Sequence, residues 1–120
     1  KTVAILGLTF KAGTDDMREA PSLTIVGRLL ENGATVRAFD PEGMDNARRL
    51  MPDVDYCRDA DHCIDGADIT VILTDWAEFQ SLDPKEVAEK MKGNILLDLR
   101  NVLDPAAARK AGLVYSSIGR

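Results

Sequence analysis

A chain of 120 residues is long enough for one domain with a substantial core, and 45% hydrophobic with 29% charged residues is ordinary for a soluble globular protein. The net charge of −5 argues against nucleic-acid binding and anionic-membrane binding, so any bound anion must be held by a few local basic groups. No apolar run is long enough to span a bilayer, and no signal peptide is found. Because the chain opens on Lys1 and runs directly into a strand, we expect a piece of a longer polypeptide.

The first half of the chain alternates between extended and helical patterns. Its predicted elements are, in order, a strand at 3–6, a helix at 23–30 with Pro21 in its first turn, a strand at 34–39, a helix at 42–51, an extended piece at 54–56 and a short helix at 59–64.

The second half continues the alternation. It is predicted to contain a strand at 68–73, a turn-rich segment through Phe79, a helix at 84–91, a strand at 94–99, a helix that begins near Asp104 and runs to Lys110, and a strand at 113–116. Strands that alternate with helices indicate a three-layer, Rossmann-like α/β domain over residues 1–120, with a mainly parallel sheet and helices on both faces.

Four separate stretches lie where predicted strands end. They are the loop at 7–22, Asp40, Asp75-Trp76 and the segment Asp98 to Arg100. Ligands of such sheets bind outside the carboxyl ends of the strands, so a functional site is expected at this edge. The loop at 7–22 is several residues longer than the usual connection of about 2–6 residues and is rich in charge; a solvated surface loop is the alternative.

A dinucleotide site within this chain is not expected. The fingerprint Gly-x-Gly-x-x-Gly should follow the first strand, but Gly7 is followed by Leu-Thr-Phe and the next glycine is Gly13. Asp40 stands where a ribose-binding acid would follow the second strand, yet without the glycines it is better interpreted as a turn residue before Pro41.

Basic side chains give this edge its chemistry. Lys11 and Arg18 leave the long loop, and Arg100 follows another strand. A lysine supplies a mobile point charge and an arginine a planar fork for phosphate or carboxylate, so the three could hold a diphosphate. The alternative is local ion pairing, of Arg18 with Asp15 or Glu19 and of Arg100 with Asp98, which is worth about 0–1 kcal/mol near a surface.

Three motifs resemble one known family. Residues 7–22, Gly-Leu-Thr-Phe-Lys-Ala-Gly-Thr-Asp-Asp-Met-Arg-Glu-Ala-Pro-Ser, resemble the opening of the C-terminal domain of UDP-glucose 6-dehydrogenases and their GDP-mannose and UDP-N-acetylmannosamine relatives. Thr74-Asp75-Trp76 and Asp98-Leu99-Arg100-Asn101 resemble two further motifs of these enzymes, in the same order and at similar spacing. The resemblance covers almost the whole chain and is nearest to bacterial UDP-glucose 6-dehydrogenase.

The resemblance implies a nucleotide-sugar (UDP)-binding domain of a larger, cytoplasmic enzyme of polysaccharide biosynthesis. Such enzymes oxidise the C6 alcohol of a UDP-sugar to a carboxylate in two NAD-dependent steps, through a thiol-linked intermediate. By resemblance, Phe10, Lys11 and Arg100 contact the UDP-sugar, and Arg18 reaches NAD across the cleft. The Trp76 ring is expected to pack under the site. NAD is implied to bind mainly to an N-terminal domain, with a central region forming a homodimer interface.

The catalytic parts of the family are missing from these 120 residues. Neither Cys57 nor Cys63 stands in the family's Gly-rich catalytic context, so both are interpreted as structural. The histidine, His62, is interpreted as a surface or packing residue. Two cysteines without metal-ligand spacing argue against a disulfide framework and a zinc site, and we expect this fragment to be inactive by itself.

Other functions stay open from the sequence. The domain could belong to a UDP-N-acetylmannosamine or GDP-mannose dehydrogenase, or be a stand-alone nucleotide-binding or regulatory module without catalysis. A phosphorelay receiver would need acidic residues where Gly7-Leu8 stand. A purely structural or assembly role lacks the isolated apolar patch that would favour it.

Overall fold

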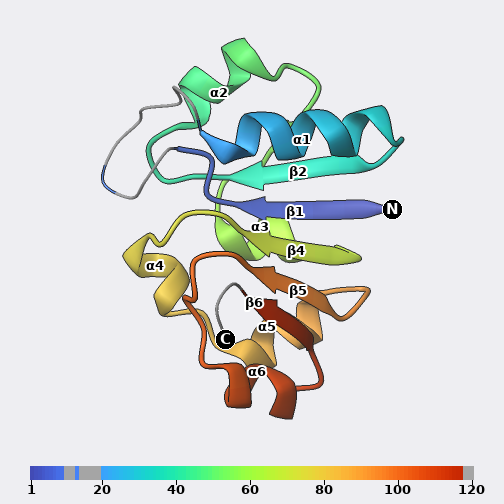
Figure 1. The fold of residues 1–120 in the computed structure, drawn as a ribbon, viewed down its shortest axis with the longest axis vertical. Helices are drawn as coiled ribbons and strands as arrows, with labels where there is room; N and C mark the ends of the chain where they lie inside the picture. The colour runs from blue at the N-terminus through green and yellow to red at the C-terminus, as the bar shows by residue number, and fades with distance from the viewer. Residues whose placement is uncertain (10–12, 14–19, 118–120) are drawn as a thin grey trace.

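The described residues build one six-stranded, all-parallel sheet in the order β3-β2-β1-β4-β5-β6 (Figure 1). The computed structural model describes residues 1–9, 13 and 20–117. The strands are β1 (Thr2–Leu6), β2 (Thr35–Phe39), β3 (Asp55–Tyr56), β4 (Ile69–Ile72), β5 (Ile95–Asp98) and β6 (Val114–Ser117). This order confirms the predicted Rossmann-like architecture and places the point where the topology switches direction between β1 and β4.

Helices connect successive strands, and local sequence sets where several of them begin. They are α1 (Pro21–Glu31), α2 (Met44–Leu50), α3 (Ala60–Ile64), α4 (Ala77–Gln80), α5 (Pro84–Lys90) and α6 (Pro105–Lys110). Asp83 and Asp104 each stand before a proline and accept a hydrogen bond from a backbone N–H of the first turn. Since a first-turn N–H has no partner within the helix, an aspartate cap followed by proline is a strong start signal.

The sheet separates two apolar clusters. On one face, Ala4, Leu6 and Leu96 pack against residues of α3, α5 and α6. On the other face, Val3, Ile5 and their neighbours pack against α1 and α2. Figure 1 shows α1 and α2 in front of the sheet and α3 behind it. The result is a three-layer domain whose core lies on both sides of β1 and β4.

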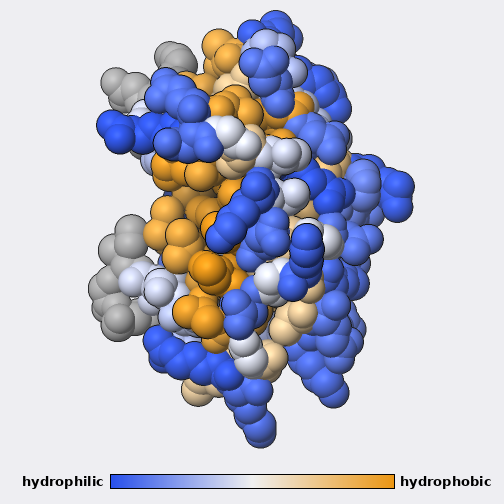
Figure 2. All heavy atoms as spheres, turned by 90° about the vertical axis from the view of Figure 1, so that its right-hand side faces the viewer, coloured by the Kyte–Doolittle hydropathy of each residue, from blue (hydrophilic) through white to orange (hydrophobic). Residues whose placement is uncertain are grey.

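The front face is covered unevenly. Helix α1 packs mainly against β2, whereas Ile95 and Leu97 on β5 are only partly buried and Val114 on β6 is 56% exposed. Figure 2 looks at the ends where the strands begin and shows a strip of apolar side chains between hydrophilic surfaces. Among the described residues, no helix is long and apolar enough to cross a membrane.

One helix was not predicted. The segment expected to be turn-rich contains α4, a single turn that forms because Trp76 O accepts hydrogen bonds from Phe79 N and Gln80 N. Phe79 is fully buried and meets the Phe39 ring edge-on, with 6.2 Å between the centroids. Tertiary burial of one aromatic side chain therefore stabilises a helix too short to show a periodic pattern.

Candidate functional site

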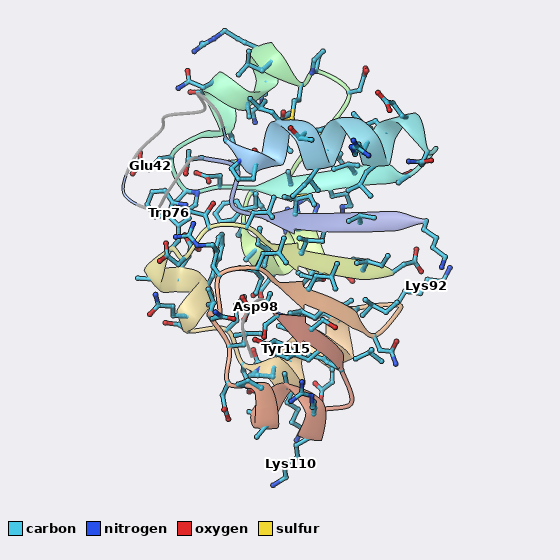
Figure 3. All side chains as sticks on the ribbon, in the orientation of Figure 1. Glu42, Trp76, Lys92, Asp98, Lys110 and Tyr115 are labelled. Carbon is cyan, nitrogen blue, oxygen red and sulfur yellow. The ribbon has the colours of Figure 1, made fainter. Side chains whose placement is uncertain are left out.

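As far as the structure describes them, the stretches predicted to converge meet at the carboxyl edge of the sheet. Backbone bonds continue the ladder past the strands, from Gly7 N to Phe39 O and from Leu73 N to Leu6 O, both at 2.9 Å. Leu99 N donates to Ile72 O at 3.0 Å in the same way. In Figure 3, Glu42 and Trp76 lie at this edge, and Lys92 lies at the opposite end of the sheet.

Asp40 is the residue that joins these strand ends. Its side chain is fully buried, and Oδ2 accepts hydrogen bonds from Leu8 N at 2.7 Å, Thr9 N at 3.2 Å and Trp76 Nε1 at 3.2 Å. Thr9 Oγ1 also donates to Oδ2, at 3.3 Å. A buried carboxylate is stable only when such donors compensate for lost water, so this one is committed to holding the backbone of β1 against β2 and β4.

The other oxygen of Asp40 makes the predicted turn. Oδ1 accepts from Glu42 N at 2.9 Å and Gly43 N at 2.7 Å, the pattern of an aspartate turn that leads into α2. A Cβ on Gly43 would lie 2.4 Å from Thr9 Cγ2, so the turn packs directly on the β1 connection. The interpretation of Asp40 as a turn residue is confirmed, and its lone pairs are taken up by the protein.

The backbone after β1 is also fixed at close range. Gly7 has φ of +96°, and a Cβ there would lie 2.5 Å from Thr74 Cβ and 2.7 Å from Thr74 N. Thr74 Oγ1 donates to Thr9 O at 3.2 Å, and Ser22 Oγ donates to Leu8 O at 2.6 Å. The first residues of the long connection are thus anchored to β4 and to α1, although the loop that follows is long.

Asp98 organises the neighbouring strand end. Its buried carboxylate accepts from Val102 N at 3.0 Å and Leu103 N at 2.8 Å, and Arg100 N lies 3.3 Å from Oδ1. Tyr115 Oη, from β6, donates to Oδ2 at 2.6 Å; Figure 3 shows the two side chains together. The chain after β5 therefore turns tightly, which presents the Arg100 side chain at the edge.

The Arg100 side chain forms an ion pair with Asp75. Its Nη2 atom lies 3.6 Å from Asp75 Oδ1, and the two side chains are 36% and 43% exposed. The alternative of an ion pair between Arg100 and Asp98 is wrong, because the Asp98 oxygens are occupied by backbone N–H groups and Tyr115. Arg100 is a partly exposed guanidinium that one carboxylate steadies from the end of β4, and such a pair is weak enough for an anion to displace.

The remaining predicted site residues fall in two groups. Trp76 is half-buried, packs against the cluster on the α3 side and donates to Asp40, which agrees with the expected packing role. Phe10, Lys11 and Arg18 lie outside the described residues. Within the described ranges, no group of three His, Cys, Asp or Glu side chains could hold a metal ion.

Electrostatics beside this edge are acidic. Glu78, in α4, is exposed, and partial loss of water around its carboxylate raises its pKa; the nearby Asp40 and Asp59 add to the effect. Sequence reasoning missed the Asp98–Tyr115 contact, which depends on two strands that are neighbours only after folding. The sequence could also have indicated that the Asp40 side chain bonds to the backbone of this turn, since Asp-Pro-Glu-Gly is a typical aspartate-turn sequence.

Comparison with known proteins gives a consistent result. Residues 4–105 match the model of the UDP-glucose/GDP-mannose dehydrogenase family, UDP binding domain. UDP-glucose 6-dehydrogenase of Rhizobium meliloti is 46% identical over 118 residues, which cover 98% of this chain and 27% of that protein. UDP-glucose 6-dehydrogenase of Bacillus subtilis is 40% identical over 121 residues, covering 100% of this chain and 28% of that protein.

Solved structures show the same similarity. An NDP-N-acetyl-D-galactosaminuronic acid dehydrogenase from Methanosarcina mazei superposes with a TM-score of 0.88 at 30% identity, over 100% of this chain and 25% of that one. A UDP-glucose dehydrogenase from Pyrobaculum islandicum gives a TM-score of 0.79 at 34% identity, over 97% and 24%. The chain spans about a quarter of the length of the relatives it matches.

Proposed function

The chain belongs to the UDP-glucose/GDP-mannose dehydrogenase family, as its UDP-binding domain, and from this we propose that it supplies the nucleotide-sugar site of an NAD-dependent UDP-glucose 6-dehydrogenase. The proposed reaction oxidises the C6 alcohol of UDP-glucose to the carboxylate of UDP-glucuronate, in two steps through a thiol-linked intermediate. The thiol and the hydride-accepting site belong to parts of the polypeptide outside residues 1–120. The identity of 46% to a UDP-glucose 6-dehydrogenase supports this choice of substrate.

The observation that carries the proposal is the position of Arg100. Its guanidinium stands at the carboxyl edge of β5, next to the switch point between β1 and β4, with Asp75 as its ion-pair partner at 3.6 Å. A planar fork there can bind two oxygens of a diphosphate, and exchanging one carboxylate for a more highly charged group is favourable. Arg100 is therefore proposed to bind the diphosphate portion of the UDP-sugar.

The loop before α1 is proposed to supply the remaining contacts. Phe10 and Lys11 would contact the UDP-sugar, and Arg18 would reach NAD bound on the opposite wall of the cleft. The anchoring of Leu8 and Thr9 to Asp40 supports this, because it fixes the point from which the loop leaves the sheet.

The described residues do not suit a dinucleotide in the usual Rossmann position. The backbone at Gly7 is pressed against Thr74, and the acid that would hold a ribose is enclosed by donors from the protein itself. NAD is therefore proposed to bind mainly to another domain, and residues 1–120 are proposed to bind and orient the nucleotide sugar without catalysing its oxidation.

The uneven covering of the sheet suggests where other parts of the enzyme pack. The half of the front face with Ile95, Leu97 and Val114 is apolar and partly exposed. We place the N-terminal and central domains of a larger polypeptide, and its homodimer partner, among the proposed partners. The cytoplasm is the proposed location, since the nucleotide substrate and NAD are found there and both cysteines are free thiols.

Titration of the isotope-labelled chain with UDP, followed by amide chemical shifts, tests the proposal at affinities as weak as millimolar. We expect shifts confined to the edge formed by 7–9, 40–43, 74–76 and 98–102, and their loss in Arg100→Ala. Arg28→Ala is the matched control, because Arg28 is exposed near the end of α1 away from this edge. Shifts that persist in Arg100→Ala would contradict the assigned role, and the absence of any shift at millimolar UDP would contradict binding by this domain.

The choice of nucleotide is tested in the same way. GDP and GDP-mannose should shift the amides less than UDP does if the family assignment to UDP-glucose is right. A complete protein that contains this domain should reduce NAD with UDP-glucose; a complete protein that binds UDP without reducing NAD would favour a stand-alone regulatory module.

A further inference from the structure

Asp75 is a carboxylate at the proposed binding edge whose oxygens the protein leaves available. It follows β4, its side chain is 43% exposed, and Oδ1 lies 3.6 Å from Arg100 Nη2. Within the described residues, neither oxygen of Asp75 accepts a hydrogen bond. The buried acids of the same edge, Asp40 and Asp98, are instead filled with donors from the protein. Asp75 therefore has the capacity to accept hydrogen bonds from a ligand.

The acid that binds ribose in the usual Rossmann arrangement is already in use. That acid follows β2, where this chain has Asp40. Trp76 Nε1 donates to Asp40 Oδ2 at 3.2 Å, and Leu8 N donates to the same atom at 2.7 Å. A nucleotide at this edge therefore needs another hydroxyl acceptor. Asp75 lies on the other side of the switch point, next to the arginine proposed to bind phosphate.

The backbone holds the Asp75–Arg100 pair in place from both strands. Strands β4 and β5 pair in parallel, so the segments that follow them leave the sheet side by side. Gln80 Nε2, in α4, donates to Asp75 O at 3.2 Å, and Asp98 Oδ1 lies 3.3 Å from Arg100 N. Side chains carried by a fixed backbone lose little conformational freedom on binding, which favours a specific site over a loose charge contact.

A diphosphate bound by Arg100 would bring negative charge close to Asp75. Like charges repel, so a bare anion binds this arginine only against the repulsion of the carboxylate. A nucleotide sugar differs from a bare anion because its ribose and its hexose carry vicinal hydroxyl groups, a few bonds from the phosphates. Two adjacent O–H donors match the two acceptor oxygens of a carboxylate, and hydrogen bonds to a charged acceptor are short and strong.

On the basis of the proposed function, we propose that Asp75 is a specificity-determining residue: it accepts hydrogen bonds from a vicinal diol of the nucleotide sugar while Arg100 binds the diphosphate. The hydroxyl groups compensate the carboxylate for the lost ion pair. A ligand without the diol makes no such bonds and still meets the repulsion. The pair of opposite charges thus selects nucleotide sugars over inorganic phosphate and pyrophosphate at the same arginine.

Glu42 is a second exposed acid at this edge and provides a matched control (Figure 3). It lies in the turn after β2, and no described basic side chain forms an ion pair with it. A hydroxyl bonded to Glu42 would lie away from the arginine proposed to bind phosphate. Removal of this carboxylate should therefore leave the discrimination between ligands unchanged.

Matched ligand pairs measure the contribution of one hydroxyl group. Dissociation constants of UDP and 2′-deoxy-UDP, and of UDP-glucose and UDP-2-deoxyglucose, are obtained from amide chemical shifts of the isotope-labelled chain. For the wild type, we expect the deoxy ligand of at least one pair to bind about tenfold more weakly, the size expected for a hydrogen bond to a charged group. The pair that shows the effect identifies the ribose or the hexose as the source of the diol.

Substitution of Asp75 should remove this discrimination. In Asp75→Ala, the ratio of the two dissociation constants should fall to about one, whereas Glu42→Ala should keep the wild-type ratio. Asp75→Asn, which retains one acceptor oxygen, should give an intermediate ratio. Because each ratio compares two ligands on the same folded variant, a purely structural role of Asp75 would not change it.

Pyrophosphate gives a test of opposite sign. It has no hydroxyl pair, so Asp75→Ala should bind it about two- to fivefold more tightly than the wild type does, since the competing carboxylate is gone. A general loss of structure would instead weaken the binding of pyrophosphate and of UDP together.

Four results would overturn the role of Asp75. They are equal binding of both members of each pair by the wild type, a ratio that persists in Asp75→Ala, a ratio that is lost in Glu42→Ala, and pyrophosphate binding that is unchanged or weaker in Asp75→Ala. Each of them leaves UDP binding by the domain intact. The absence of any shift at millimolar UDP would instead contradict the proposed function itself, so the two failures are distinguishable.

Discussion

Trp76 Nε1 donates to Asp40 Oδ2 at 3.2 Å, so a residue that follows β4 is bonded to one that follows β2, across the β1 strand between them. The same carboxylate oxygen accepts from Leu8 N, directly after β1. A single buried acid therefore sets the relative positions of three strand ends at the edge where we propose that the nucleotide sugar binds.

Asp40→Asn should destabilise the domain strongly. Each Asp40 oxygen accepts at least two backbone N–H groups, so an amide NH2 in either position leaves at least two donors facing another donor. We expect the free energy of unfolding in urea to fall by at least about 2 kcal/mol. Asp45→Asn, at a side chain that is 89% exposed, should change it by less than about 0.5 kcal/mol. Equal values for the two variants would contradict the role given to Asp40.

Gly7→Ala should cost more stability than Gly33→Ala. Both glycines have positive φ, +96° and +83°, and an L-residue there costs about 1–2 kcal/mol. A Cβ at Gly7 would in addition lie 2.5 Å from Thr74 Cβ, whereas at Gly33 no atom lies within 4 Å. The amount by which Gly7→Ala loses more unfolding free energy than Gly33→Ala gives the cost of the clash with Thr74. Equal losses in the two variants would show that this contact relaxes without cost.

Tyr115→Phe should loosen the turn that carries Arg100. The hydroxyl donates to Asp98 Oδ2 at 2.6 Å from inside the core, and a bond to a charged acceptor is worth about 1.5–3 kcal/mol. We expect the free energy of unfolding in urea to fall by that amount, and we expect the amide chemical shifts of residues 98–103 to change. If UDP binds as proposed, affinity should fall as well, because Asp98 shapes the turn before Arg100. Unchanged shifts in this segment would argue against the coupling.

Tyr56 should make stability decline at high pH. Burial raises the pKa of its hydroxyl to about 12 although Arg48 opposes the shift, and the hydroxyl donates to Met51 O at 2.7 Å. Because the folded state holds this proton more tightly than the unfolded chain, whose tyrosine titrates near pH 10, the stabilisation is complete below about pH 10 and is lost as the pH rises towards 12.

The measurement compares wild type with Tyr56→Phe. The phenolate absorbance of the wild type minus that of the variant gives the titration of Tyr56, and urea unfolding at pH 9 and pH 11 gives the stability. The wild type should lose more stability than the variant between these pH values. A Tyr56 titration at the ordinary value of about 10 would contradict the prediction.

Most of the fold could be predicted because its signals are local. Aspartate-proline starts at α5 and α6, the apolar run of β4 and the alternation of elements each reflect the chemistry of a few neighbouring residues. The three motifs that resemble the family were visible for the same reason, since each is a contiguous run after a strand. Helix α4 was missed because its stability comes from the burial of Phe79 against Phe39.

The sequence by itself determined the fold class, the family, the edge of the sheet where its motifs meet and the absence of a glycine-rich dinucleotide turn. Only the tertiary structure decided which acid pairs with Arg100 and how Asp40 uses its lone pairs. The reason is physical: strand and helix formation depends on neighbours along the chain, whereas a carboxylate bonds whichever donors the strand order brings beside it. Asp75 Oδ1 and Arg100 Nη2 are 3.6 Å apart because the two residues follow β4 and β5, which are neighbours in the sheet.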